Sequence, residues 1–285
     1  MALRGDAPPK TKPETTTDKH IVDVLIEERA KTFSGLVLRL PLLGRLLRNV
    51  LLYQDAKLLA DQISDSSGEG VFDYLVHRLD LDVDFSGLEN VPAVGAAVVV
   101  ANHPTGLADG VAIWQALRLV RKDVVFFANA DALRVNSRLA EVVIPIEWRI
   151  GQRSPSRSRV ALVEAQKAIR EGKCLVIFPS GIPAVPTPIF VKEQPWLPTF
   201  VSIAGRAGAP IVPIGITARN SRLFYLFCMV NKPLRHMSLF REFLNKKGAT
   251  FRLVAHPPVM VHSRPPNQAQ IVENLRALLA GPEHS

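Results

Sequence analysis

Short apolar runs rich in β-branched residues alternate with longer helical segments through most of this 285-residue chain. Apolar runs of this kind, bounded by Pro, Gly or charged residues, are typical of strands buried on both faces of a sheet. The alternation of such strands with helices predicts an α/β fold, with a mainly parallel mixed sheet flanked by helices. The predicted strands include residues 98–100, 124–127, 142–146, 174–178 and 211–216.

The chain is expected to divide into three parts. Residues 1–18 are rich in Thr, Pro and Lys with no apolar core, which predicts a disordered tail and no secretory signal. Residues 19–80 are predicted to form an N-terminal helical region, in which 61–70 is a polar linker. Residues 81–285 form the main domain.

One segment of the N-terminal region, residues 36–52, mixes Leu-rich bulk with three arginines. It is too charged to span a bilayer, but it could lie in a membrane interface with its arginines among phosphates. A core-facing helical hairpin with solvated arginines explains the same pattern, so both interpretations stay open.

Charge and cysteine content narrow the classes of partner. The net charge of +9 favours anionic partners, namely nucleic acid, an anionic membrane surface, or an acidic protein or substrate. Basic residues are not interleaved with stacking aromatics, so we expect no nucleic acid. Cys174 and Cys228 lie in apolar runs and are predicted to be reduced thiols of a cytosolic protein. No Cys/His cluster has zinc-like spacing, so no metal is expected.

The central strand leads directly into polar residues that can do chemistry. After Val98–Val100 the chain breaks at Asn102-His103-Pro104-Thr105-Gly106 and continues as a predicted helix from about Ala108. His103 and Asp109 can meet only if His103 lies in the turn and Asp109 in the first helical turn. Asp109 would then fix the imidazole tautomer and leave the other nitrogen free as a general base. The alternative is a turn histidine that caps backbone groups and an Asp that stabilises the start of the helix.

A basic stretch follows the third predicted strand. Arg149 and Arg153 precede further arginines at the start of a predicted helix over residues 156–171. Guanidinium groups match phosphate oxygens, which makes this stretch a candidate phosphate site. A solvated basic loop is the alternative.

Four pieces of the sequence follow one another in a recognisable order. They are Asn102-His103…Asp109, the Arg-bearing stretch 146–153, Phe178-Pro179-Ser180-Gly181, and Ile211-Val212-Pro213-Ile214. Over about residues 85–260 this order resembles the phospholipid/glycerol acyltransferase family, the lysophosphatidic acid acyltransferase-like proteins. The likeness is greatest to its bacterial hemolysin-like branch, which has segments like Asn220–Tyr225 and Arg241–Gly248.

The resemblance implies roles for these residues. His103 and Asp109 would be catalytic. Here five residues separate them, where the common motif has four, and Ser180 stands where the third motif usually carries an acceptor-binding Glu. The residues expected to bind substrate are Asn102, Gly106, Arg149, Arg153, Phe178, Pro179, Ser180 and Gly181, with backbone N–H groups near Gly106 or Gly181 as oxyanion donors.

The family also implies a reaction and its setting. Residues 81–285 would be an acyltransferase domain that moves a fatty acyl group from a thioester to a hydroxyl of a lysophospholipid or related lysolipid, in membrane lipid biosynthesis. The thioester of acyl carrier protein or coenzyme A is a co-substrate, and no cofactor is expected. The chain would be cytoplasmic and peripherally bound to the anionic inner membrane. The alternative is a catalytically silent lipid-binding or membrane-surface protein of the same fold.

Overall fold

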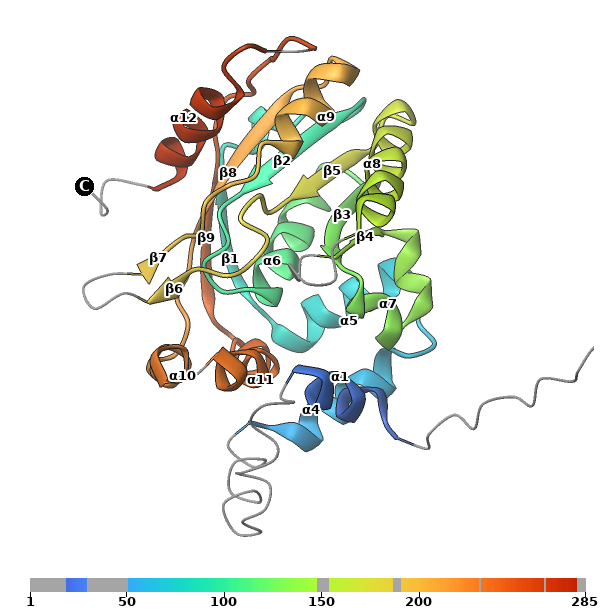
Figure 1. Ribbon diagram of the computed structural model, residues 1–285, viewed down its shortest axis with the longest axis vertical. Helices are drawn as coiled ribbons and strands as arrows, with labels where there is room; N and C mark the ends of the chain where they lie inside the picture. The colour runs from blue at the N-terminus through green and yellow to red at the C-terminus, as the bar shows by residue number, and fades with distance from the viewer. Residues whose placement is uncertain are drawn as a thin grey trace, which may run out of the picture.

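The computed structural model describes residues 19–29, 51–147, 154–186, 191–230, 232–263 and 265–280. Within these ranges seven strands form one sheet in the order β1-β9-β8-β2-β5-β3-β4 (Figure 1). Strands β8, β2, β5, β3 and β4 are parallel to one another, β9 is antiparallel to β8, and β1 is parallel to β9. The predicted mainly parallel mixed sheet is confirmed. The strands are β1 (Asp82–Ser86), β2 (Ala97–Ala101), β3 (Val124–Asn129), β4 (Val143–Ile146), β5 (Cys174–Ile177), β8 (Ile211–Thr217) and β9 (Thr250–Ala255).

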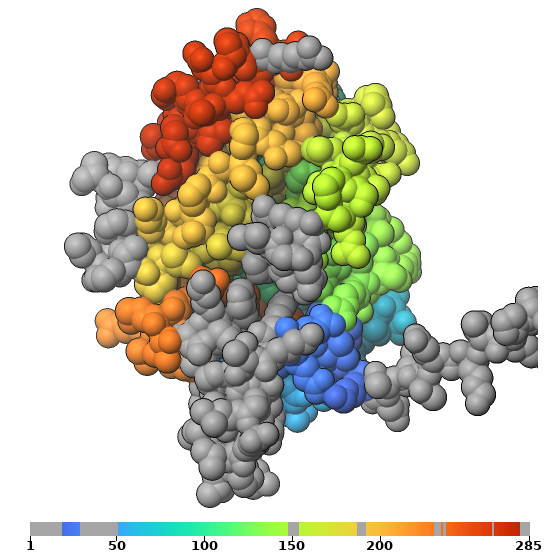
Figure 2. All heavy atoms as spheres, viewed as in Figure 1, coloured from blue at the N-terminus to red at the C-terminus, as the bar shows by residue number. Residues whose placement is uncertain are grey.

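Helices cover both faces of the sheet (Figure 1). One face packs against α8 (Pro155–Arg170), α9 (Thr199–Ala207) and α12 (Gln268–Ala280). These three helices form much of the surface seen in Figure 2, with α12 in red and α8 in yellow-green. The opposite face packs against α5 (Gly68–Leu79) and α6 (Leu107–Leu117).

Strand β2 shows why this sheet must be covered on both sides. Val98 and Val100 point into the cluster under α8, α9 and α12, whereas Val99 points into the cluster under α6. All three side chains are fully buried. Alternate residues of a strand point to opposite faces, so a strand that is apolar at every position needs a partner layer on each face.

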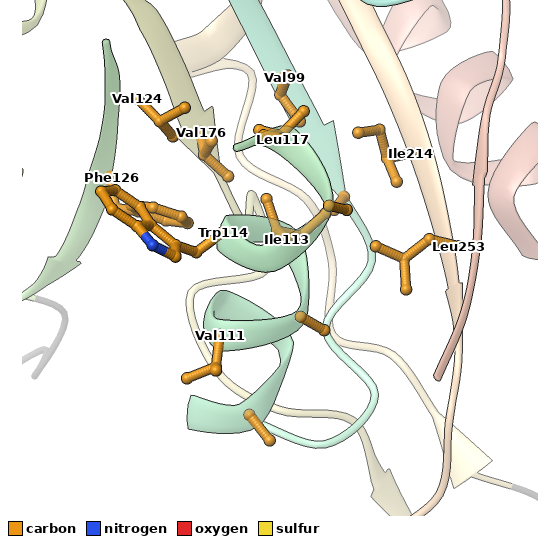
Figure 3. Close-up of a cluster of buried hydrophobic side chains, with 14 of the residues drawn as sticks. Val99, Val111, Ile113, Trp114, Leu117, Val124, Phe126, Val176, Ile214 and Leu253 are labelled. Atoms are coloured by element: carbon orange, nitrogen blue, oxygen red, sulfur yellow. The ribbon is translucent and has the colours of Figure 1, made fainter. Parts of the chain in front are cut away.

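Helix α6 fills the core on its face (Figure 3). Trp114 and Ile113 are buried against side chains from several strands. The Trp114 ring lies 4.7 Å from the Phe72 ring of α5, and Phe72 stacks in turn on Phe126 of β3. This packing fixes α6, and therefore its first turn, at the carboxyl end of β2.

The antiparallel strand β9 has a simple cause. Two consecutive helices, α10 (Arg222–Val230) and α11 (Lys232–Leu244), pack together after β8, at the end of the sheet where that strand stops (Figure 1). The chain therefore re-enters the sheet from the same end, and β9 must run antiparallel to β8. Strand β1 then pairs with β9 and forms the sheet edge that its alternating pattern predicts.

The polar linker predicted over residues 61–70 is mostly helical. Helix α4 (Tyr53–Ile63) ends and α5 begins within five residues. The Ser67 side chain caps α5 by accepting from the Gly70 N–H at 3.0 Å. Gly68 is needed for close packing, since an added Cβ would lie 2.8 Å from the Arg138 carbonyl oxygen. Ser and Gly here are helix-start residues.

The rest of the N-terminal region, which is predicted to be helical, contributes α1 (Ile21–Arg29), and this helix packs on α4 and α11 (Figure 1). The predicted tail, residues 1–18, and most of the predicted interfacial segment, residues 36–50, lie outside the described residues. In the described part of the chain, no helix is both long and apolar enough to cross a membrane.

Candidate functional site

The His103 turn (residues 102–106) joins β2 to α6 and places two ionisable side chains in contact. His103 Nδ1 lies 2.8 Å from Asp109 Oδ2. His103 stands in the turn and Asp109 in the first turn of α6, which is the arrangement that the spacing predicts. The Asp109 side chain is 0% exposed and that of His103 is 14% exposed. The carboxylate is thus shielded from water while the imidazole keeps access to its surroundings.

Asp109 is held by the turn that it supports. Its Oδ2 accepts from the backbone N–H groups of Thr105 and Gly106, each at 2.9 Å. Its Oδ1 accepts from the Thr105 hydroxyl at 2.6 Å. With both oxygens engaged, Asp109 acts as acceptor toward His103, so Nδ1 carries the proton and Nε2 is the basic nitrogen.

The His103 ring and main chain are fixed by two further segments. The ring stacks on Phe178, which follows β5, with centroids 4.3 Å apart. The His103 N–H donates to Glu193 Oε1 at 2.9 Å, and the His103 carbonyl accepts from the Ala184 N–H at 2.8 Å. Burial raises the pKa of Glu193, although the His103 N–H opposes that shift. Glu193 lies next to a short hairpin formed by β6 (Val185–Pro186) and β7 (Val191–Lys192).

His103 lines an apolar cavity of about 320 Å³ at the carboxyl end of the sheet. That volume lies within the range of roughly 300–1,000 Å³ found for ligand pockets. Side chains from α1, α4, α5, α6 and α11 close around it. Representative lining residues are Leu25, Leu59, Phe72, Val111, Phe126, Phe224, Leu239 and Phe243.

Helix α10 carries the apolar stretch 223–230, and its residues have two different environments. Phe224 is buried and lines the cavity. Leu226, Met229 and Val230 are 49%, 63% and 65% exposed. Phe224 is therefore part of the core, whereas these three residues lie on the exposed side of α10.

Gly106 and Gly181, near which oxyanion donors are expected, use their own N–H groups within the chain. The Gly106 N–H donates to Asp109, and the Gly181 N–H donates to the Phe178 carbonyl at 3.0 Å. Both glycines have positive φ, 101° and 68°. The two glycine N–H groups are therefore engaged in turns of the chain. Oxyanion donors near these glycines stay a prediction.

The other predicted binding residues beside the turn are also engaged with the chain. The Asn102 side chain accepts from the Ile216 N–H at 2.6 Å and donates to the Ile216 carbonyl at 2.8 Å. The Ser180 hydroxyl donates to the Ile182 carbonyl at 3.1 Å, and the Pro179 carbonyl accepts from the Leu197 N–H at 3.1 Å. These bonds hold β2, β5 and β8 in place around the cavity, and contacts with substrate stay predictions.

Arg149 and Arg153, the predicted phosphate-binding residues, lie outside the described residues. Strand β4 ends at Ile146, and the described residues stop at Glu147 and resume at Ser154. Their role stays a prediction.

A buried polar network behind the His103 turn was not predicted. The Asn220 amide nitrogen lies 3.4 and 3.3 Å from the carbonyl oxygens of Pro104 and Thr105. Next to it, Ser221 donates through its N–H and hydroxyl to Glu242 at 2.6 and 2.7 Å. Glu242 also pairs with Lys246, and both residues are buried. The sequence signal was present in the segments Asn220–Tyr225 and Arg241–Gly248, but without any assigned contact.

Comparison with known proteins bears on what this site does. A family model described as Acyltransferase matches residues 82–217. A lyso-glycine lipid O-acyltransferase of Phocaeicola vulgatus is 31% identical over 206 residues, covering 69% of this chain and 72% of that protein. A protein of the same name from Bacteroides thetaiotaomicron is 26% identical over 219 residues, covering 75% and 79%. The 1-acyl-sn-glycerophosphate acyltransferase structure from Thermotoga maritima aligns at 18% identity with a TM-score of 0.48, covering 93% of this chain and 99% of that one.

Proposed function

Because this chain belongs to the phospholipid/glycerol acyltransferase family and is an O-acyltransferase of the lysolipid type, we propose that His103 is its general base. The single observation that supports this assignment is the 2.8 Å contact between His103 Nδ1 and the buried Asp109 carboxylate. The contact leaves Nε2 of a cavity-lining imidazole as the proton acceptor.

In the proposed reaction, Nε2 of His103 takes the proton from the acceptor hydroxyl while that oxygen attacks the thioester carbonyl carbon. The tetrahedral intermediate then collapses, the C–S bond breaks, and the imidazolium returns the proton to the leaving thiolate. Asp109 stabilises the imidazolium formed between these steps. No acyl-enzyme intermediate is required, because the acceptor hydroxyl itself attacks the thioester carbonyl carbon.

The apolar cavity is proposed to receive an acyl chain. Its wall is built from Leu, Val, Ile and Phe side chains, and His103 and Gly106 stand at one part of it. Burying each methylene of a chain in such a wall contributes about 0.8 kcal/mol. An acyl chain bound there would place its ester-forming carbon near His103.

The acceptor and donor follow from the relatives and from charge. Both curated relatives are named for a lyso-glycine lipid, and we propose an acceptor of that amino-acid lysolipid class, in membrane lipid biosynthesis. The donor is proposed to be the thioester of acyl carrier protein or coenzyme A. Both donors are anionic, which suits a chain of net charge +9.

We propose that the chain is cytoplasmic and binds the inner membrane peripherally through α10. Its exposed residues Leu226, Met229 and Val230 have the i, i+3, i+4 spacing of one helix face. Replacing all three by Ser should weaken sedimentation with anionic liposomes several-fold. The matched control replaces Val160 and Val163, which are 62% and 51% exposed on α8, and should sediment like wild type. Equal sedimentation of all three proteins would contradict the α10 assignment.

The proposed reaction is tested with purified protein and labelled acyl thioesters of both donor types against a panel of lysolipids, a lyso-glycine lipid included. His103→Ala should lower turnover by roughly 10³-fold or more while the thermal unfolding midpoint stays close to that of wild type. His77→Ala, at an exposed histidine of α5, is the control and should keep full turnover. Turnover retained in His103→Ala would exclude His103 as the base, and liposome binding with no turnover in wild type would exclude the proposed reaction.

A further inference from the structure

One cation stands in the wall of the apolar cavity. Arg235 of α11 lines the cavity and is half-buried. Among the described lining residues it is the sole Lys or Arg. The other acidic and basic groups in that wall have partners, since His103 is paired with Asp109 and Asp131 lies 3.2 Å from Arg134.

Arg235 has no carboxylate within ion-pair distance among the described residues. The acidic residue of α11 at position 242 already has cationic partners, because Glu242 pairs with Lys246 and lies 3.7 Å from Arg241. The sequence from residue 30 to residue 50 contains no Asp or Glu at all. A guanidinium at the edge of an apolar wall without a counter-charge is costly unless a ligand supplies the anion.

The position of Arg235 relates it to the His103 turn. Leu239 is four residues further along α11 and lines the same cavity, so the two side chains lie on one helix face. The Leu239 Cδ2 atom is 3.8 Å from the point where a Cβ on Gly106 would lie. Arg235 is therefore about one helical turn, roughly 5–6 Å, from the residue that touches the His103 turn.

We infer that Arg235 binds the anionic head of the acceptor, through two oxygens of a carboxylate or a phosphate. This inference rests on the proposed function, in which a lysolipid hydroxyl must reach His103. A lysolipid carries a hydroxyl and a charged head besides its chain. Beside its apolar wall, the cavity presents a base for that hydroxyl and one guanidinium for that head. The planar guanidinium donates two parallel hydrogen bonds to either oxyanion, which fixes the head as well as attracting it.

The test measures binding, so that it does not depend on turnover. The probes are N-decanoylglycine, its uncharged methyl ester, decyl phosphate and decanol, each below its micelle concentration, titrated into the full chain by calorimetry. Wild type should bind N-decanoylglycine about 10-fold or more tightly than the methyl ester. Arg235→Gln should lose that preference, and Arg235→Lys should keep part of it. The control is Arg78→Gln, which removes an exposed charge. Arg78 lies on α5, a helix that contributes other residues to the cavity wall, and the variant should behave like wild type.

The outcomes separate this inference from the proposed function. An Arg235-dependent preference for N-decanoylglycine identifies a carboxylate, and one for decyl phosphate over decanol identifies a phosphate. No preference in wild type, or a preference that survives in Arg235→Gln, overturns the assignment. Failure of wild type to transfer an acyl group in the turnover assay would refute the proposed reaction, while the binding titrations would still decide whether Arg235 holds an oxyanion. Circular dichroism melting of each variant establishes that it is folded.

Discussion

The backbone N–H of His103 donates to Glu193 Oε1 at 2.9 Å, so a second carboxylate lies behind the proposed base. Burial raises the pKa of Glu193 above its ordinary value of 4.5. In the folded protein this carboxyl therefore keeps a proton that the unfolded chain releases near that value. The folded state binds more protons over this window, and the contribution of Glu193 to stability falls as pH rises through it.

Glu193→Gln keeps an oxygen acceptor for the His103 N–H and removes the buried charge. We expect the difference in free energy of unfolding, variant minus wild type, to rise as pH increases from 4 to 8, because only wild type bears the cost of ionisation. Urea unfolding of both proteins across this range measures it. Glu164→Gln, at an exposed glutamate of α8, should leave the difference flat, and an equally flat curve for Glu193→Gln would contradict the argument.

Asp109 holds the His103 turn together as well as the imidazole, and two substitutions should separate these roles. Asp109→Ala removes the acceptor of three donors besides His103, all in a buried site, and should destabilise the fold by roughly 3 kcal/mol or more. Asp109→Asn keeps the shape but disturbs the tautomer, so kcat should fall by roughly 10³–10⁴-fold. Thr105→Val, which deletes one donor, should cost about 1 kcal/mol with most of the activity kept. Denaturant unfolding and turnover rates measure the three effects.

The pair His103 and Asp109 was predictable because its signal is local. The β-branched strand, the Pro and Gly of the turn and the start of α6 all lie within about a dozen residues, and local geometry fixes where the two side chains can meet. The burial of β2 on both faces, and hence the covered parallel sheet, followed from the same run.

Other parts of the site depend on contacts that no local pattern encodes. Glu193 reaches the His103 N–H from 90 positions along the chain, and Asn220 reaches Thr105 from 115 positions. Both contacts exist only because the sheet brings the ends of β2, β5 and β8 side by side. The sequence predicts oxyanion donors near Gly106 or Gly181, and only the structure shows that Asp109 and Phe178 already accept from the N–H groups of these two glycines.

Glu242 should be important for stability although it lies outside the cavity wall. It accepts from Ser221 and pairs with Lys246, and both charged residues are buried. Glu242→Ala leaves the Lys246 ammonium buried without its partner, which should cost about 3–5 kcal/mol. Because Asn220 adjoins this network and contacts the His103 turn, turnover should also fall in the protein that remains folded. Lys247→Ala, at the exposed neighbour, should change neither property, and unfolding curves with turnover assays provide the comparison.

Gly110 should set how much acyl chain the cavity accepts. It lies on α6 and lines the cavity, and an added Cβ would meet no atom within 4 Å. A graded series can therefore grow into the cavity without a backbone clash. Gly110→Ala should stabilise α6 by up to about 1 kcal/mol, through helix propensity, with little change in chain preference.

Gly110→Leu should occupy part of the cavity and shift preference from long acyl thioesters toward shorter ones. The expected change is roughly 4- to 15-fold in the ratio of kcat/KM between hexadecanoyl and decanoyl donors, since one or two methylenes at about 0.8 kcal/mol each would lose their place. Competition assays with mixed donors measure that ratio directly. An unchanged ratio in a folded Gly110→Leu variant would contradict the proposal that the acyl chain uses this cavity, because Gly110 lines it.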